Sequence, residues 1–226
     1  YGRLEDELAY RRSSTFDMEI GSVAAWYRAV ENQVGVTELA PWNPEGFRSC
    51  LMQARAYSVL RDPEIFVPRI RNLFELVGVA LCIAPAPAGC PVSGAARMIN
   101  GHGMIALSSR HLTDDHFWFS LFHEAGHLLL HGGRLSIEVE SPSSVGSVEE
   151  AEANSFAERI IIPDEFSSEF SLLPLNKFSI ARFARQLGVA PGLIVGQLQH
   201  SRRLRFNQMN FFKVRYKWTK TSLGMV

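Results

Sequence analysis

Hydrophobic residues recur at helical spacing near the start of the chain. Between residues 20 and 34, the apolar positions Val23, Trp26, Tyr27 and Val30 are separated by one, three or four residues. This spacing places them on one face of a helix and leaves the polar positions on the other. The pattern therefore predicts an amphipathic helix over residues 20–34.

Two more helices are predicted before the first apolar run. Asn43-Pro44-Glu45-Gly46 is a turn signal that precedes a helical segment at residues 47–60. Pro63 and Pro68 bracket the start of a third helix, which should run to about Leu76.

Short apolar runs then indicate a small sheet. Residues 77–83 are apolar and partly β-branched, as in a buried strand. Residues 97–100 and 104–107 read as a hairpin, because Gly101-His102-Gly103 between them can supply the positive φ of a turn. Residues 135–139 are a further strand candidate.

The longest helical pattern runs from His116 to His131. Thr113-Asp114-Asp115 is a capping signal before it, and Gly132-Gly133 is an expected stop. The residues of this helix are apolar on nearly all of its faces, which predicts that the helix is buried. A Ser/Pro/Gly-rich loop at 141–147 and a helix at 148–162 should follow.

From Phe178 onward the chain reads as two short helices and a basic, aromatic tail. Ala184, Gly188 and Ile194 stand at helix-turn-helix offsets, with arginines nearby. Pro191-Gly192 would open the recognition helix and leaves few side chains to read bases. We therefore favour a packing or partner-docking role over DNA binding.

These elements predict an α+β fold in which helices back a small sheet. The expected organisation is a linker at 1–15, an N-terminal helical segment at 16–76, a central core at 77–175 and a helical, helix-turn-helix-like C-terminal segment at 176–226. With 226 residues, 46% of them hydrophobic, the chain can form a substantial core.

Charge and cysteine content narrow the partners and the compartment. Lys plus Arg and Asp plus Glu number 23 each, which argues against bulk nucleic acid or an anionic membrane as a partner. Cys50, Cys82 and Cys90 form no CxxC pair, so we expect idle thiols in a reducing compartment, the cytoplasm. No signal peptide or membrane span is visible.

The candidate chemistry lies in His-Glu-Ala-Gly-His at residues 123–127. His123 and His127 are four residues apart, so on a helix they share a face and can bind one metal ion. Glu124 stands beside that face, where it can act as a general base. The alternative is a pair of hydrogen-bonded core histidines with Glu124 in an ion pair.

A catalytic zinc site needs a third protein ligand. The metzincin pattern HExxHxxGxxH is excluded because positions 130 and 133 are Leu130 and Gly133. A glutamate from the next helix would make a gluzincin. Glu150 is favoured, since it shares a face with small residues that permit close helix packing; Glu149 is a weaker alternative, and Glu152 should be solvated.

Three more residues are candidates for supporting roles. Asn154 could hold the outer nitrogen of a ligand histidine, or it could be an ordinary surface residue. His131 is too far along the helix to share the ion and reads as a C-terminal cap or a substrate contact. Arg110 could bind substrate or the oxyanion, or form a surface ion pair. We expect the neighbouring strand 104–107 to be an edge that binds substrate backbone.

Several segments together resemble the ImmA/IrrE family of metallo-endopeptidases. They are SGAAR at 93–97, IALSSR at 105–110, DHFWF at 115–119, HEAGHLLLHG at 123–132 and EAEANSFAERIIIP at 150–163. The resemblance covers roughly residues 16–218 and implies one zinc ion per chain, with Glu150 as third ligand. The chain is similar in pattern to family members that carry an N-terminal helix-turn-helix of the HigA/Xre antitoxin type. Since the chain begins at Tyr1, we expect that this segment, and any DNA contact through it, is missing.

The resemblance also implies a specific function. Zinc-dependent cleavage of a partner transcriptional repressor or antitoxin, encoded nearby, would derepress stress, mobile-element or toxin genes. Two other readings stay open. One is a DNA-binding regulator with a vestigial zinc site, and the other is a zinc-stabilised interaction module that cleaves nothing.

Overall fold

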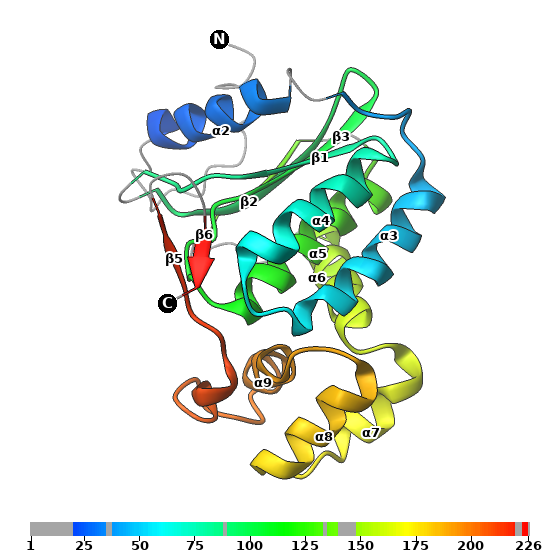
Figure 1. Cartoon of the computed structure of the whole chain (residues 1–226), viewed down its shortest axis with the longest axis vertical. Helices are drawn as coiled ribbons and strands as arrows, with labels where there is room; N and C mark the ends of the chain where they lie inside the picture. Colours follow the sequence, from blue (N-terminus) through cyan, green and yellow to red (C-terminus); the bar gives the residue numbers. More distant parts are fainter. Residues whose placement is uncertain are drawn as a thin grey trace.

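The fold is of mixed α+β class (Figure 1). The structure is a computed structural model and describes residues 20–34, 38–87, 90–132, 135–139, 148–219 and 223–225. The linker predicted at 1–15 and the loop predicted at 141–147 lie outside these ranges.

The three N-terminal helices form where the apolar spacing and the prolines predict them. They are α2 at Ile20–Val34, α3 at Pro44–Ala56 and α4 at Pro63–Glu75. A 3-10 turn at Tyr57–Val59 follows α3. The Asn43 side chain accepts a hydrogen bond from the Gly46 N–H at 2.9 Å, so α3 starts earlier than expected. Asp62 caps α4 in the same way.

Four strands form a mixed sheet in the order β1-β3-β2-β4. β1 is parallel to β3, whereas β2 is antiparallel to both β3 and β4. The bounds are Val79–Ile83 for β1, Val92–Ile99 for β2, His102–Leu107 for β3 and Ser136–Val139 for β4. The predicted hairpin is confirmed, but its turn is the pair Asn100-Gly101, at φ 50° and 83°.

The prediction that residues 104–107 form an edge strand is wrong. β3 lies between β1 and β2 and is hydrogen-bonded on both sides. Residues 104–107 are all buried, as expected for an interior strand covered on both faces. The two edges of the sheet are β1 and β4.

Helices cover both faces of the sheet (Figure 1). α2 packs on one face, against alternate strand side chains that include Ala80, Met104 and Ala106. Trp26 of α2 also donates its indole N–H to the Ala84 carbonyl at 3.0 Å. The other face presents Val79, Leu81, Ile105 and Leu107 to the core shared with α3, α4 and the next two helices.

Those two helices carry the candidate site. α5 spans Asp114–Leu130 and α6 spans Val148–Ile161. Most of α5 is buried, including the fully enclosed Trp118 and Phe122. α6 ends at Ile161, whose carbonyl accepts hydrogen bonds from Nε and Nη2 of the buried Arg55 at 3.4 and 3.1 Å. Arg55 thus ties the end of α6 to α3.

The C-terminal segment contains the two short helices that the pattern predicts, and a strand pair that it does not. The elements that follow α6 are a 3-10 turn at Asp164–Phe166, α7 at Ser167–Ser171, α8 at Lys177–Leu187, α9 at Pro191–His200, a 3-10 turn at Asn210–Phe212, β5 at Tyr216–Trp218 and β6 at Leu223–Met225. β5 and β6 pair antiparallel. α9 packs against α5, and seven of its ten residues are buried.

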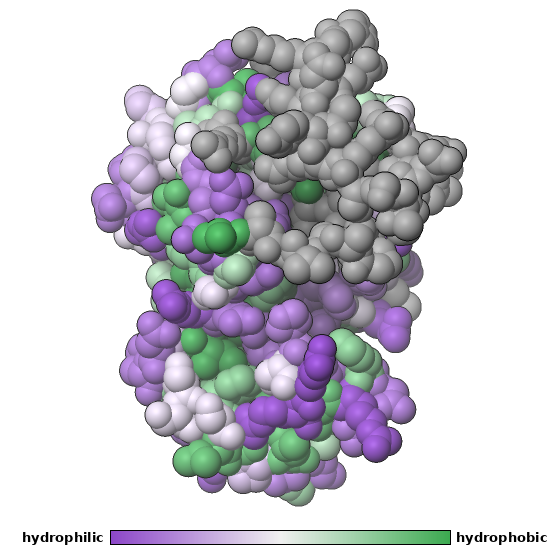
Figure 2. All heavy atoms as spheres, turned by 180° about the vertical axis from the view of Figure 1, so that it is seen from behind, coloured by the Kyte–Doolittle hydropathy of each residue, from purple (hydrophilic) through white to green (hydrophobic). Residues whose placement is uncertain are grey.

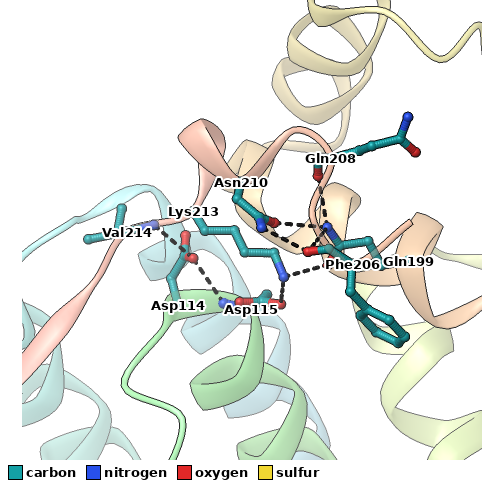
Figure 3. A network of polar contacts seen from close by, with 8 residues as sticks. All are labelled: Asp114, Asp115, Gln199, Phe206, Gln208, Asn210, Lys213 and Val214. Atoms are coloured by element: carbon teal, nitrogen blue, oxygen red, sulfur yellow. Dashed lines mark hydrogen bonds and ion pairs between the residues drawn. The ribbon is translucent and has the colours of Figure 1, made fainter. Parts of the chain in front are cut away.

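A network of polar contacts fastens this segment to the first turn of α5 (Figure 3). The Lys213 ammonium lies 2.5 Å from Oδ2 of Asp115 and donates to Gln199 Oε1 at 2.7 Å. Oδ1 of Asp114 accepts the Val214 N–H at 3.0 Å. We call Asp114, Asp115, Gln199, Lys213 and Val214 the clasp.

The face of the C-terminal lobe visible in Figure 2 is mixed in polarity, and the three cysteines lie in the interior. Seen from behind, apolar and polar side chains are interspersed over the lobe of α7, α8 and α9 (Figure 2). Cys50, Cys82 and Cys90 are free and buried, and burial raises the pKa of Cys82 to about 11. In the described part of the chain, no helix has both the length and the apolar character required to span a bilayer.

Candidate metal centre

The centre lies where α5 and α6 pack closely against each other. A Cβ added at Gly126 of α5 would lie 3.2 Å from the Ala153 Cα of α6. Ala153 and Ala157 are fully buried in the same contact. Small residues on both helices therefore allow the close packing that was expected of the Glu150 face, and they bring Glu150 over the HExxH motif.

Three side chains converge between these helices. Nε2 of His123 and Nε2 of His127 are 3.1 Å apart, and they lie 3.3 and 3.5 Å from the Glu150 carboxylate. One ligand atom from each residue lies within 4.8 Å of the others. Two ligands at about 2.0–2.1 Å from a tetrahedral zinc are about 3.4 Å apart. The nitrogen and oxygen donors and their spacing therefore fit a divalent metal such as zinc.

Electrostatics favour the protonation states that a metal ion requires. Burial lowers the pKa of His127, so its imidazole is held neutral. Burial alone would raise the pKa of Glu150, but its contacts with the two histidines outweigh burial and hold the pKa well below its usual range. A neutral imidazole and an ionised carboxylate are the forms that bind metal.

Glu124 lies beside this cluster, on the side of the sheet. Its side chain is fully buried. A Cβ added at Gly94 of β2 would lie only 2.5 Å from Oε1 of Glu124. β2 therefore needs glycine at this position to accommodate the carboxylate. Sequence reasoning missed Gly94, although the run of small residues in SGAAR was a signal of close packing.

The outer nitrogens of the two histidines have different partners. Nδ1 of His123 lies 2.9 Å from Oδ1 of Asn154, so the structure brings together the pair that the helical spacing suggested. Nδ1 of His127 lies 3.1 Å from Nδ1 of His131, which also ends α5 as its C-cap.

Glu152 is solvated, as expected, but it also has a partner that was not expected. Its side chain is 55% exposed, yet Oε2 lies 2.9 Å from Nε2 of His131. Because Glu152 is two residues after Glu150, it lies on a different face of α6. The side chain of His131, at the end of α5, contacts Glu152 on that face.

Arg110 lies at the surface and lines a small, open hollow. Ser93, which precedes Gly94, and Ser120, one helical turn before His123 and Glu124, also line this hollow. Arg110 is therefore near the Glu124 side of the centre but is not one of the converging residues.

Comparison with protein families agrees with this geometry. Residues 87–195 match the model of a peptidase family described as the IrrE N-terminal-like domain. This match supports the assignment of the chain to the ImmA/IrrE family. The matched segment includes β2, α5 and α6, and so all the converging residues. The match to this peptidase family indicates a metallopeptidase. No curated protein sequence matches the chain.

Proposed function

We propose that this ImmA/IrrE chain is a zinc-dependent endopeptidase of the gluzincin type. The observation that carries the proposal is the convergence of His123, His127 and Glu150, with ligand atoms within 4.8 Å of one another, beside the buried Glu124. Two histidines and one glutamate are a ligand set of catalytic zinc, which leaves one position open.

The metal ligands and Glu124 have different roles in the proposed reaction. Zinc held by His123, His127 and Glu150 would polarise the scissile carbonyl and lower the pKa of water. Glu124 accepts the proton of the attacking water and passes it to the leaving amine nitrogen. The close contact with β2 at Gly94 restricts where its carboxylate can lie.

The substrate backbone would pair with β4. β4 is the sheet edge next to β2, and β2 is the strand that borders Glu124. An edge strand binds extended peptide through main-chain hydrogen bonds, largely independent of sequence. Arg110, beside the hollow on the same side, would bind a substrate carbonyl or carboxylate, or stabilise the oxyanion.

The proposed substrate is a single partner protein, a transcriptional repressor or antitoxin encoded nearby. This step rests on the family resemblance and on the even charge balance, which disfavours nucleic acid as the main partner. The rival DNA-binding role is weakened by α9. Its buried residues face the protein, so the would-be recognition helix has little surface to offer a major groove.

Co-expression with candidate repressors, together with zinc analysis of the purified chain, tests the proposal. Glu124→Gln should retain one zinc per chain and lower cleavage by about 10²–10⁴-fold, as expected for loss of a general base. Glu165→Gln, at an exposed glutamate, is the matched control and should cleave normally. Full cleavage by Glu124→Gln would refute its role. Unfolding on chelation, with no cut in any partner, would instead indicate an interaction module.

A further inference from the structure

Glu152, His131 and His127 form a hydrogen-bonded chain that leads from the surface to the metal centre. The exposed Glu152 carboxylate lies 2.9 Å from Nε2 of His131, and Nδ1 of His131 lies 3.1 Å from Nδ1 of His127. The His131 side chain itself is 8% exposed. A side chain of α6, the C-cap of α5 and a side chain in the last turn of α5 are thus linked in series.

The hydrogens in this chain can be assigned from its chemistry. An ionised carboxylate only accepts hydrogen bonds, so His131 donates through Nε2–H. A neutral imidazole has one N–H, and therefore Nδ1 of His131 must accept. The donor to it can only be Nδ1–H of His127. This leaves the lone pair of His127 on Nε2, the atom that faces His123 and Glu150.

The contact between His123 and Asn154 gives no comparable directional control. Its partner Asn154 presents a carboxamide, whose oxygen accepts and whose nitrogen donates. Rotation of the amide could therefore satisfy either tautomer of His123. Glu152 cannot donate in its ionised form, so the chain through His131 has one direction only.

We propose that Glu152 acts through His131 as a positioning residue that fixes His127 in its metal-binding tautomer. The inference rests on the proposed zinc site. Outer partners of ligand histidines orient the ring and raise its basicity, and losing one costs about 10–100-fold in metal affinity. We expect losses in this range for His131→Ala and for Glu152→Ala.

A double-mutant cycle on zinc affinity separates this role from a simple charge effect. The affinity is measured on the full chain at pH 8 by competition with a chromophoric chelator. If Glu152 acts through His131, the double variant should bind zinc as weakly as His131→Ala alone. If Glu152 merely adds negative charge near the ion, its removal will weaken binding further in the His131→Ala background, which would overturn the proposal.

Glu158→Gln is the matched control, because Glu158 is on α6 and lies 3.9 Å from His200 rather than near the centre. It should bind zinc like the wild type. An equal loss in Glu158→Gln would show that any charge on α6 matters, and would contradict the chain.

Tautomer-sensitive ¹⁵N NMR of the metal-free chain gives a readout that needs neither zinc nor activity. His127 should be protonated on Nδ1 and His131 on Nε2, and Glu152→Ala should leave both as tautomer mixtures. Unchanged tautomers in Glu152→Ala would refute the inference even if the wild type binds zinc and cleaves. Conversely, a wild type that binds no zinc but shows these tautomers would refute the proposed function and leave the chain intact.

Discussion

Two regions of α5 bury polar side chains, and the partners of these side chains differ between the two regions. Each buries polar side chains in a helix that is otherwise apolar, with Asp114 and Asp115 in the first turn and His123, Glu124 and His127 further on. In the clasp the protein supplies its own cation, since the Lys213 ammonium lies 2.5 Å from Asp115. In the metal centre the converging groups are two imidazoles and a carboxylate, a set that suits an external cation.

The difference shows that polar residues in a buried helix do not by themselves indicate function. Asp114 and Asp115 are as deeply buried as the histidines, yet their partners are structural groups of the C-terminal segment. What distinguishes the metal centre is that its donors point at one another at ligand spacing. We expect the clasp to hold the fold without metal, and the centre to contribute stability only when metal is bound.

Removing the cation of the clasp should have the largest effect on stability. Lys213→Met leaves Asp115 buried without its partner, which typically costs about 3–5 kcal/mol of unfolding free energy. Denaturant unfolding of the metal-free chain measures the loss, and Asp115→Asn in the same background should recover part of it. Lys217→Met, at an exposed lysine, is the control and should change stability by at most about 0.5 kcal/mol. Equal stabilities of the two lysine variants would contradict a structural clasp.

Zinc should stabilise the other end by a comparable amount. At a free zinc concentration 100 times the dissociation constant, binding to the folded state adds about 2.7 kcal/mol. Glu150→Gln should abolish this gain at the same zinc concentration, while Glu149→Gln should keep it. If Glu149→Gln loses the gain and Glu150→Gln retains it, the third ligand is Glu149. Neither substitution should reproduce the metal-independent loss expected of Lys213→Met.

The metal centre could be predicted from the sequence because its signals are local. The i to i+4 spacing of His123 and His127, and the small residues around Glu150, depend only on helical periodicity. The clasp could not be predicted in this way. Asp114 and Val214 are 100 residues apart, and no spacing rule relates them.

The order of the strands in the sheet could not be predicted from local sequence patterns either. The run at 104–107 correctly indicated a strand, but its neighbours depend on how the chain crosses from β1 past β3 to β2. The partners of Glu152 and Glu124 were missed for the same reason. Each contacts a residue on another element, His131 and Gly94, whose position follows from tertiary packing.

The clasp should also make stability depend on pH. Burial, then the charge of Asp115, raise the pKa of Asp114 to about 7, against hydrogen bonds from Val214 and Asp115 N–H and the charge of Lys213. The folded-state pKa lies above the unfolded value of about 3.9. The stability contributed by protonated Asp114 is therefore complete below about pH 4 and is lost as the pH rises to about 7.

Asp114→Asn removes this titration while keeping an oxygen that can accept the Val214 N–H. Relative to the wild type, the variant should gain about 2–3 kcal/mol of unfolding free energy between pH 5 and pH 8. Denaturant unfolding at the two pH values measures this. Asp164→Asn, whose side chain is 77% exposed, should follow the wild-type pH profile. A parallel profile for Asp114→Asn would show that Asp114 is ionised throughout this range.

The smallest effect on stability should come from filling the space between α9 and Asp115 of the clasp. A Cβ added at Gly196 would lie 2.8 Å from the Asp115 Cβ. Gly196→Ala should therefore push α9 away from α5 and cost about 1–2 kcal/mol, net of the gain in helix propensity. Gly21→Ala in α2 meets no atom within 4 Å and should not be destabilising. Zinc affinity should stay unchanged in Gly196→Ala, because Glu150 is positioned by α6. A parallel loss of zinc affinity would mean that the two ends of α5 are coupled, and that the clasp also positions the metal ligands.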